Sequence, residues 1–487
     1  MHQNSNSKIK IIIVGAGKAG ELIAEDIASD KFSSFSIVGF VDDDPKKQNS
    51  KLEGIGILGK ISDLKRLIKD NNVDEIFIAI PSERGKVIRK IVEDTSGLGI
   101  IYKILPRLSE VLMQDFDKDY LKYIRKVKPE DLLGGEILKS DQSEIAQYTK
   151  NQIILITGAA GSIGSELSRQ MTSYGAKKII LYDWWENGMF ELRNQLIENN
   201  PESRFEFIIG DIKDKNKINL VLKTFKPTTI FHAAAYKHVP LMEQNPSEAI
   251  KNNILGTKIV AEAAINHNVN KFILVSSDKA VNPTNIMGAT KRAAEKVIHI
   301  LSQTPESKTI FCAVRFGNVI NSNGSAIPTF ERQIEKGGPV TVTDKEVTRY
   351  FMTIPEAVHL ILQSWVMGVN NDLFVLDMGE PIKIYDLAKL LIMLQGYVPE
   401  KDIKIKIIGL RPGEKLYEEV LVGEEKTNST SVKKIFRTKN YLKFNKLDFL
   451  SNLDSLINSL EEDDLNIENL RNKLKAIVST YGPSSNA

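Results

Sequence analysis

The chain has 487 residues, which is enough for roughly three domains of about 150 residues each. Hydrophobic residues make up 42% and charged residues 26%, so the chain can bury a core and is not a disordered protein. Its formal net charge of +3 argues against a strongly basic nucleic-acid-binding protein. One cysteine, Cys312, excludes an intrachain disulfide framework, and the six histidines lack metal-ligating spacing, so no metal site is expected.

The start of the chain carries no recognisable targeting segment. The first seven residues are polar and short, unlike a signal peptide. The longest uncharged apolar runs, such as 11–16, fall far below the ~20 residues needed to span a bilayer. We therefore expect a soluble, cytoplasmic chain without a membrane span, and the low cysteine content fits a reducing compartment.

An apolar strand, a glycine-rich turn and a helix open the first predicted domain. Gly15, Gly17 and Gly20 follow the strand at 11–14, and an acidic run at 42–44 follows the next strand. Such glycines allow the backbone to approach a pyrophosphate, and the carboxylates could accept bonds from a ribose. The pattern predicts a nucleotide or related ligand, with an inherited fold that binds none as the alternative. Further strands are expected at 36–41, 75–80 and 100–104.

The stretch 125–143 has the composition of a connection, with a proline, a Gly-Gly pair and mixed charge. A second strand, glycine turn and helix begin at 153, which implies two doubly wound Rossmann-type α/β domains. We expect an N-terminal nucleotide-fold domain at 1–125, a linker at 126–150, a catalytic domain at 151–440 and a helical tail at 441–487.

The second domain supplies a longer series of strands separated by helical patterns, so a parallel sheet is expected. The strands are predicted at 153–157, 178–182, 206–209, 229–232, 272–276, 310–315 and 373–378. Past about residue 320 prolines and glycines interrupt the rhythm, which predicts a smaller, loop-rich part. The stretch 447–474 has leucine and isoleucine at helical spacing and predicts a pair of surface helices.

Four strand ends of this second domain predict a site for NAD. Its turn has GxxGxxG spacing, and Asp183 ends the following strand, where a carboxylate bonds the ribose 2′-hydroxyl and disfavours the 2′-phosphate of NADP. A carboxylate at the third strand end can reach the adenine edge, and small residues at the fourth leave room for the cofactor. The predicted cofactor-binding residues are Gly158, Gly161, Ser162, Ile163, Gly164, Asp183, Asp211, Ile212, Ala233, Ala234 and Lys291.

The fifth strand ends in the polar run Ser276-Ser277-Asp278-Lys279. In open α/β sheets ligands lie at the carboxyl ends of strands, so these residues are placed for chemistry. Met287 and Lys291 follow at i and i+4, one turn apart on the same face of a predicted helix.

The glycine turn, the Ser-Asp-Lys strand end and the Met-x-x-x-Lys helix together resemble an extended short-chain dehydrogenase/reductase with a small C-terminal substrate-binding part. Most of that superfamily has tyrosine where Met287 stands, and methionine cannot ionise. The stretch 277–292 is similar to UDP-N-acetylglucosamine 4,6-dehydratases of the large polysaccharide-biosynthesis type. Further matches to that family are His232-Ala233-Ala234-Ala235-Tyr236-Lys237-His238, Arg315-Phe316-Gly317-Asn318-Val319, Thr348-Arg349-Tyr350 and Arg411-Pro412-Gly413-Glu414-Lys415.

The resemblance implies a lyase that uses NAD and a UDP-sugar and acts in surface polysaccharide or glycan biosynthesis. It implies that Asp278 protonates the C6 hydroxyl and Lys279 removes the C5 proton, with configuration at C5 retained. A neutral lysine base requires a lowered pKa and a protonated aspartic acid a raised one, and a dry site could supply both. Full-length relatives carry membrane helices before the first domain, which this sequence does not show, and a homo-oligomer is expected.

Lys291 is expected to hold the nicotinamide ribose, and Ser277 to hydrogen-bond the C4 oxygen. With methionine at 287, the C4 proton could leave through Ser277, a water or a ribose hydroxyl, and the sequence leaves these routes open. The candidate substrate contacts are Lys237, His238, Asn318, Arg349, Arg411 and Glu414. Each of these could instead form a surface salt bridge. Two alternatives to the dehydratase are a nucleotide-sugar 4-epimerase and a non-catalytic nucleotide-binding regulatory protein.

Overall fold

The computed structural model groups the chain into two compact units. The residues it describes are 8–30, 33–80, 85–106, 120–133, 142–198, 200–305, 307–419, 421, 426–439, 444–460 and 466–482. Unit 1 comprises 1–136, 326–345 and 383–408, and unit 2 comprises 137–325, 346–382 and 409–487. Residues 326–345 and 383–408 thus pack with the N-terminal segment, although they lie within the stretch 151–440. The domain boundaries expected from the sequence remain predictions, and residues 134–141 of the expected connection lie outside the described residues.

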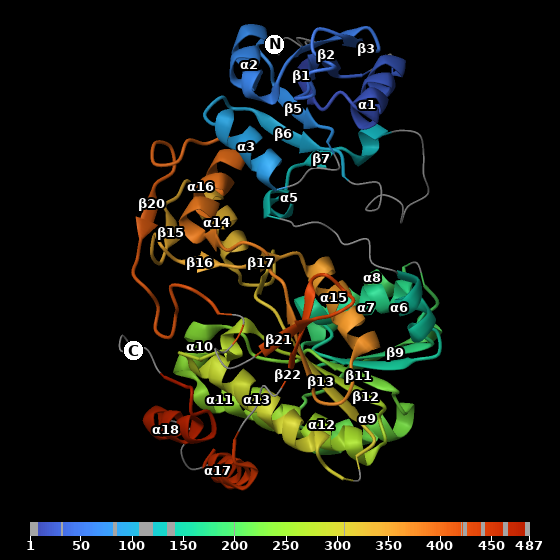
Figure 1. Ribbon diagram of the computed structural model, residues 1–487, viewed down its shortest axis with the longest axis vertical. Helices are drawn as coiled ribbons and strands as arrows, with labels where there is room; N and C mark the ends of the chain where they lie inside the picture. Colours follow the sequence, from blue (N-terminus) through green and yellow to red (C-terminus); the bar gives the residue numbers. More distant parts are fainter. Residues whose placement is uncertain are drawn as a thin grey trace, which may run out of the picture. The chain divides into compact units, whose positions relative to one another are not determined.

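Unit 1 is built on a mostly parallel sheet with the order β3-β4-β2-β1-β5-β6-β7 (Figure 1). The central strands are apolar and buried on both faces, as a covered parallel sheet requires. The strands are β1 (Ile9–Val14), β2 (Phe35–Val41), β3 (Lys51–Leu52), β4 (Ile55–Gly59), β5 (Glu75–Ile78), β6 (Ile101–Ile104) and β7 (Arg125–Lys126). The helices of its first segment are α1 (Lys18–Ser29), α2 (Leu64–Asn71), α3 (Lys86–Asp94) and α5 (Pro129–Leu133).

The two later segments of unit 1 form a small helix-and-strand layer in which α16 packs against α3. Strands β15 and β20 pair in parallel within this layer. Its elements are α14 (Ala326–Glu335), β15 (Val340–Val342), α16 (Ile384–Leu394) and β20 (Ile405–Ile407). The strand β19 (Ile382–Lys383) precedes α16.

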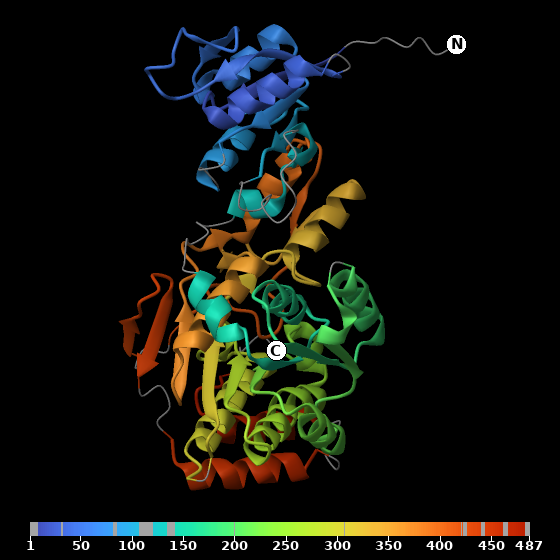
Figure 2. The same ribbon diagram turned by 90° about the vertical axis from the view of Figure 1, so that its right-hand side faces the viewer.

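Unit 2 contains a sheet with the order β10-β9-β8-β11-β12-β13-β18-β22-β21, parallel from β10 to β18. The antiparallel pair β22 and β21 closes one edge of this sheet (Figure 2). The strands are β8 (Ile153–Thr157), β9 (Lys178–Asp183), β10 (Phe205–Ile209), β11 (Thr229–His232), β12 (Lys271–Val275), β13 (Ile310–Arg315), β18 (Asp372–Leu376), β21 (Lys426–Ser429) and β22 (Ile435–Lys439). Two short pieces, β14 (Asn318–Val319) and β17 (Phe351–Met352), pair beside it, and β16 (Thr348–Arg349) pairs with β19.

Helices cover both faces of the second sheet and create one apolar core on each side. They are α6 (Gln142–Thr149), α7 (Ser162–Ser173), α8 (Glu186–Ile197), α9 (Lys215–Phe225), α10 (Val239–Gln244), α11 (Pro246–Ile250), the π-helical turn η4 (Lys251–Gly256), α12 (Thr257–Asn266), α13 (Ile286–Ser302) and α15 (Ile354–Met367). The short turn η5 (Asp278–Ala280) follows β12.

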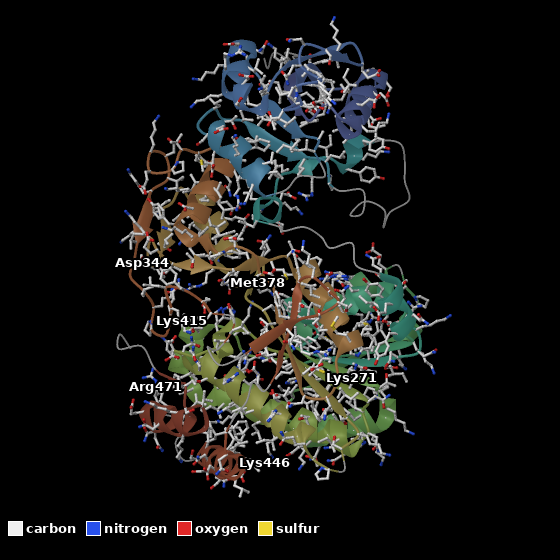
Figure 3. The ribbon with its side chains drawn as sticks, in the orientation of Figure 1. Lys271, Asp344, Met378, Lys415, Lys446 and Arg471 are labelled. Carbon is white, nitrogen blue, oxygen red and sulfur yellow. The ribbon has the colours of Figure 1, made fainter. Side chains whose placement is uncertain are left out.

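The C-terminal helices α17 (Lys446–Asn458) and α18 (Ile467–Ile477) complete a third apolar cluster around α13. Arg471 of α18, labelled in Figure 3, donates to the Glu243 carboxylate of α10 over 2.9 Å. Lys296 of α13 donates to the Ile477 carbonyl over 2.8 Å. The predicted helix pair therefore exists, but one face of it is buried against the helix that carries Met287 and Lys291.

The strands expected from the sequence are confirmed to within about two residues, and the alternation of strand and helix produced the expected parallel order. The strand β7 and the helix α5 lie in the stretch expected to be a plain connection. Among the described residues, no helix has the length and apolar character to traverse a bilayer.

Candidate functional site

The predicted site residues of unit 2 gather at the carboxyl edge of its sheet. The glycine turn follows β8, Asp183 ends β9 and Asp211 follows β10. Ala233 and Ala234 follow β11, and the Ser-Asp-Lys run follows β12. Because parallel strands end at one edge, residues up to 121 positions apart in the sequence, from Gly158 to Lys279, become neighbours.

The turn after β8 is shaped by glycines that other residues could not replace. Gly158 has φ +68°, and a Cβ there would lie 2.6 Å from the Ala234 nitrogen. A Cβ on Gly164 would lie 2.1 Å from the Gly158 carbonyl oxygen. Helix α7 therefore starts directly on the turn, with Gly161, which has no side chain to cap the helix, as its N-cap residue. These amides and this open helix start fit the pyrophosphate of a dinucleotide.

Asp183 is fixed beside this turn by backbone amides. Its two carboxylate oxygens accept hydrogen bonds from Ala160 at 3.0 Å and Trp185 at 2.9 Å. Burial raises the pKa of Asp183, although these amide donors oppose the change. The carboxylate is thus held at the end of β9, in the position where a ribose hydroxyl of NAD would meet it.

The glycine turn of unit 1 has the same features as the turn after β8. A Cβ on Gly20 would lie 2.1 Å from the Gly15 carbonyl oxygen, and the Ala16 amide donates to Asp42 over 2.8 Å. Here, however, the Lys47 ammonium also lies 2.9 Å from Asp42. Burial would raise the pKa of Asp42, but Lys47 and the amides lower it overall. The first turn therefore has the dinucleotide geometry with its acidic residue already paired to a lysine.

The third and fourth strand ends are also tightly held. The Asp211 carboxylate accepts from the Lys213 amide at 2.8 Å, and Ile212 is buried. His232 bridges Thr157 at 2.8 Å and Thr257 at 2.9 Å, and burial followed by the charge of Lys291 lowers its pKa to about 3. His232 is thus a neutral structural residue that fastens β11 to β8 just before Ala233.

Asp278, which is buried, and Lys279, whose side chain is 18% exposed, form an ion pair immediately after β12. The Lys279 ammonium lies 3.1 Å from Asp278 Oδ1 and 3.0 Å from Asn318 Oδ1. The Ser277 hydroxyl donates to the same Asp278 oxygen over 2.8 Å. The other oxygen, Asp278 Oδ2, is buried without a hydrogen-bond partner among the described residues. An orphaned buried carboxylate oxygen is costly, so it marks a position where a proton or a ligand hydroxyl is needed.

The electrostatics of this pair match the expectation for the aspartate and contradict it for the lysine. Burial, and next the charge of Glu418, raise the pKa of Asp278 against the opposing charge of Lys279. Burial alone would lower the pKa of Lys279, but the carboxylates of Asp278 and Glu418 raise it above its ordinary value. The expectation of a lowered lysine pKa is therefore wrong for this state of the site, in which Lys279 is an ammonium ion.

Glu418 is the residue that the sequence analysis missed. Its carboxylate lies 3.4 Å from Lys279 and 3.5 Å from the Arg349 guanidinium. Arg349 also contacts Glu414 at 3.1 Å, so this buried arginine joins the two acids, buried Glu418 and partly exposed Glu414, into one network. Arg411 is exposed, and its backbone amide donates to Glu414 over 3.2 Å. The motif at 411–419 could have pointed to Glu418, because it contains acidic residues beyond Glu414, the one acid assigned to substrate binding.

Helix α13 brings Met287 and Lys291 to the same edge. A Cβ on Gly288 would lie 2.1 Å from the Lys279 carbonyl oxygen, so a glycine lets the helix start against the Ser-Asp-Lys run. The Lys291 ammonium donates to the Val275 carbonyl over 2.6 Å, and burial lowers its pKa to about 8. Met287 is buried within the apolar cluster around α13.

A second network of charged side chains, centred on Glu295, holds helix α13 against the sheet. Glu295, one turn after Lys291, accepts two hydrogen bonds of 2.7 Å from Arg315 and one of 2.6 Å from Ser276. Arg292 contributes a further contact at 3.1 Å. Burial disfavours the carboxylate, but Arg315 and Arg292 hold the pKa of Glu295 below its usual range. The ends of β12 and β13 are thereby tied to α13.

The remaining predicted contacts lie around this centre. Burial and the nearby charge of Lys279 lower the pKa of Lys237. His238 is exposed and lies against Gly324, where a Cβ would approach its ring to 2.5 Å. Met378, labelled in Figure 3, follows β18, and a Cβ on Gly317 would lie 3.3 Å from it and 3.2 Å from Asp278 Oδ2.

Comparison with protein families gives two matches along the chain. A family model described as "Polysaccharide biosynthesis protein" matches residues 154–440. A model described as "CoA-binding domain" matches residues 1–105. The two matches correspond to the two glycine turns described above.

Three curated relatives show what the chain is similar to. A Staphylococcus aureus protein named "Capsular polysaccharide biosynthesis protein CapD" is 44% identical over 467 residues, covering 95% of this chain and 76% of that protein. A protein of Rickettsia bellii named "UDP-glucose 4-epimerase" is 38% identical over 59% of this chain and 82% of its own length. One of Campylobacter jejuni named "UDP-N-acetylglucosamine 4,6-dehydratase (inverting)" is 35% identical over 56% of this chain and 78% of its own length.

Two solved structures resemble the chain. Pen from Bacillus thuringiensis has a TM-score of 0.56 and 33% identity, and the match covers 61% of this chain and 90% of that one. DesIV, a dTDP-glucose 4,6-dehydratase from Streptomyces venezuelae solved with NAD and TYD, has a TM-score of 0.50 and 20% identity over 56% of this chain and 88% of that one. The second likeness establishes the fold alone.

Proposed function

Because the chain belongs to the polysaccharide biosynthesis protein family, we propose that it is an NAD-dependent enzyme that modifies a nucleotide sugar for surface polysaccharide synthesis. More specifically, we propose a lyase that converts UDP-N-acetylglucosamine to the UDP-4-keto-6-deoxy sugar. The observation that supports this proposal is the ion pair between buried Asp278 and Lys279 at the carboxyl end of β12, in which Asp278 Oδ2 has no hydrogen-bond partner among the described residues.

The residues that would hold NAD are those of the turn after β8, Asp183, the small residues after β11, and Lys291. When bound, NAD⁺ would supply the hydride acceptor for oxidation of C4 of the sugar, and its reduced form would supply the hydride for C6. The close backbone packing of Gly158 and Gly164 and the locked Asp183 carboxylate support this assignment. A carboxylate at that position disfavours NADP.

The acid and the base of the elimination are adjacent residues. Once C4 is a ketone, the C5 proton becomes acidic, and Lys279 takes it while Asp278 protonates the C6 hydroxyl, which leaves as water. The raised pKa of Asp278 suits an acid that must hold a proton near neutral pH. Ser277, bonded to Asp278 at 2.8 Å, is available for the C4 oxygen, and Lys291 adds positive charge nearby.

Substrate contacts are proposed for Lys237, His238, Asn318, Arg349, Arg411 and Glu414. Asn318 is supported by its 3.0 Å bond to Lys279, which places it beside the reacting centre. Arg349 is supported by its charge and by its place next to that centre, although Glu414 and Glu418 share it here.

A nucleotide-sugar 4-epimerase is the second candidate, favoured by the similarity to the Rickettsia bellii protein of that name. An epimerase has no elimination to perform and no need for the Asp278–Lys279 pair. Incubation with UDP-N-acetylglucosamine, followed by mass spectrometry and NMR, separates the possibilities. Loss of one water identifies a dehydratase, an isomer of unchanged mass identifies an epimerase, and no change identifies a binding protein.

A further inference from the structure

The Glu418 carboxylate contacts both the proposed base, Lys279, and an arginine of the site, Arg349. Its side chain is buried and contacts Lys279 at 3.4 Å and Arg349 at 3.5 Å. It follows the last predicted substrate contact, Glu414, by four residues, and no step of the proposed reaction uses it.

The loop that carries Glu418 is fastened to the segment between η5 and α13. The Gly413 carbonyl accepts hydrogen bonds of 3.0 Å from Thr284 and from Asn285. The Lys415 ammonium, labelled in Figure 3, donates to the Val281 carbonyl over 3.1 Å. The Leu416 carbonyl accepts from the Thr348 amide, next to Arg349, at 3.0 Å. Because the loop is held on both sides of residue 415, the Glu418 carboxylate is presented at a defined place.

We propose that Glu418 is a positioning residue of the reaction, which fixes the Lys279 amine beside Asp278 and sets the pH range in which this pair works. The proposal rests on the function proposed above. Glu418 contacts Lys279, so it acts through the base.

The charges around Lys279 support this role. Asp278 of η5 and Glu418 of the loop face its ammonium as carboxylates, and Arg349 of β16 and Lys237 after β11 face it as cations. The two acids prevail, so the pair rests as an ammonium and a carboxylate. Glu418 itself remains ionised, because Lys279 and Arg349 outweigh its burial and lower its pKa.

The working form differs from this resting form by one proton. An N–H bond of Lys279 breaks and an O–H bond forms on Asp278, 3.1 Å away, which gives a neutral amine and a carboxylic acid. The amine then takes the C5 proton, and the acid gives its proton to the departing C6 hydroxyl. The pair thereby returns to ammonium and carboxylate, and no further reagent is consumed in this step.

The test is the variant Glu418→Gln, which keeps the shape and one acceptor but removes the charge. A unit charge 3.4 Å from Lys279 shifts its titration by at least about one pH unit, even at the dielectric constant of water. We expect the alkaline limb of the kcat profile, where the pair loses its shared proton as Lys279 titrates, to move to lower pH by about that amount. The matched control is Glu419→Gln, because Glu419 is exposed and pairs with Lys415 at 3.3 Å. A Glu418→Gln profile that coincides with the wild-type and control profiles would overturn the proposal.

A second readout needs no turnover. Competitive acetylation of lysines with acetic anhydride across a pH series, read by peptide mass spectrometry, reports the titration of Lys279 directly. Lys279 should titrate at lower pH in Glu418→Gln than in wild type or Glu419→Gln, and equal titration would refute the role of Glu418. This result stands even if wild type fails to dehydrate UDP-N-acetylglucosamine, so the two failures are distinguishable.

If Glu418→Gln does not fold, Glu418→Asp serves in its place. Aspartate keeps the charge but is one methylene shorter, and it cannot hold both Lys279 and Arg349. We expect kcat to fall about tenfold or more, with the alkaline limb close to its wild-type position. A wild-type kcat in this variant would show that positioning by Glu418 is unnecessary.

Discussion

Replacing Lys279 with methionine is the sharpest test of the proposed reaction, because it removes the base while keeping the length and apolar stem of the side chain. The substitution removes contacts of 3.1 Å to Asp278, 3.0 Å to Asn318 and 3.4 Å to Glu418. Asp278 loses the cation that opposes its raised pKa, so its pKa rises further. The variant should therefore keep an acid and lack a base.

The expected loss follows from the role assigned. A positioned general base contributes about 10²–10⁴-fold, so water loss should slow by at least that factor. The oxidation at C4 depends on Lys291 and Ser277, neither of which is altered, so it should continue. Enzyme supplied with substrate should therefore accumulate bound 4-keto sugar that has not lost water.

The assay combines mass spectrometry of the sugar with a reaction in D₂O. Wild-type enzyme should place deuterium at C5 of the product, because the proton that returns there comes from solvent, and Lys279→Met should not. The matched control is Lys258→Met on α12, which removes an ammonium that pairs with Glu262 at 2.7 Å. Lys291→Met should differ from both by slowing the formation of the 4-keto sugar itself. If Lys279→Met turns over at the wild-type rate, Lys279 is not the base and the Asp278–Lys279 mechanism fails.

Four other outcomes are expected. Asp183→Ala should weaken NAD binding more than NADP binding in a titration, and an unchanged preference would count against the ribose contact. The rate of C4 oxidation should fall as pH rises through about 8, because Lys291 then loses its charge, and a profile flat to pH 10 would contradict this role. Glu295→Gln should cost about 3–5 kcal/mol in urea unfolding, since Arg315 is left buried without its counter-ion, and a loss below about 0.5 kcal/mol would show that the network is dispensable. Removing residues 1–125 should leave NAD binding intact. It should also increase the binding of an apolar dye, because the face of α16 that packs on α3 becomes exposed. Absence of NAD binding by the folded fragment would show that the domain boundary or the site assignment is wrong.

Local patterns were sufficient to predict the strands and the cofactor turn. An apolar run such as 153–157, followed by glycines and by an acid at the end of the next strand, predicts a cofactor turn without knowledge of the rest of the fold. All the residues that define this turn lie within about 30 positions of one another. The parallel order then brought Ser277, Asp278 and Lys279 to the same edge as Gly158 and Asp183.

The features that the sequence analysis did not predict depend on contacts between segments that lie far apart in the sequence. The pKa of Lys279 cannot be judged without Glu418, which lies 139 residues further along and meets Lys279 only through the fastened loop at 413–418. The Glu295–Arg315 pair joins a helix to a strand, and only the folded sheet makes it a support for the site. Grouping of residues 326–345 and 383–408 with the first unit likewise follows from packing of α16 on α3.

The burial of α13 under α17 and α18 has a consequence for the order of synthesis. The face of α13 that carries Ile286, Met287 and Val297 is covered by Leu453 and Leu474, among others. At ribosomal rates of about 5–20 residues per second, the covering segment 444–482 follows α13 by on the order of ten seconds. During that interval the helix that bears Lys291 presents an apolar face to solvent. Nascent chains of this protein should therefore be clients of chaperones that hold exposed apolar surface, until the covering helices have been translated and bury that face of α13.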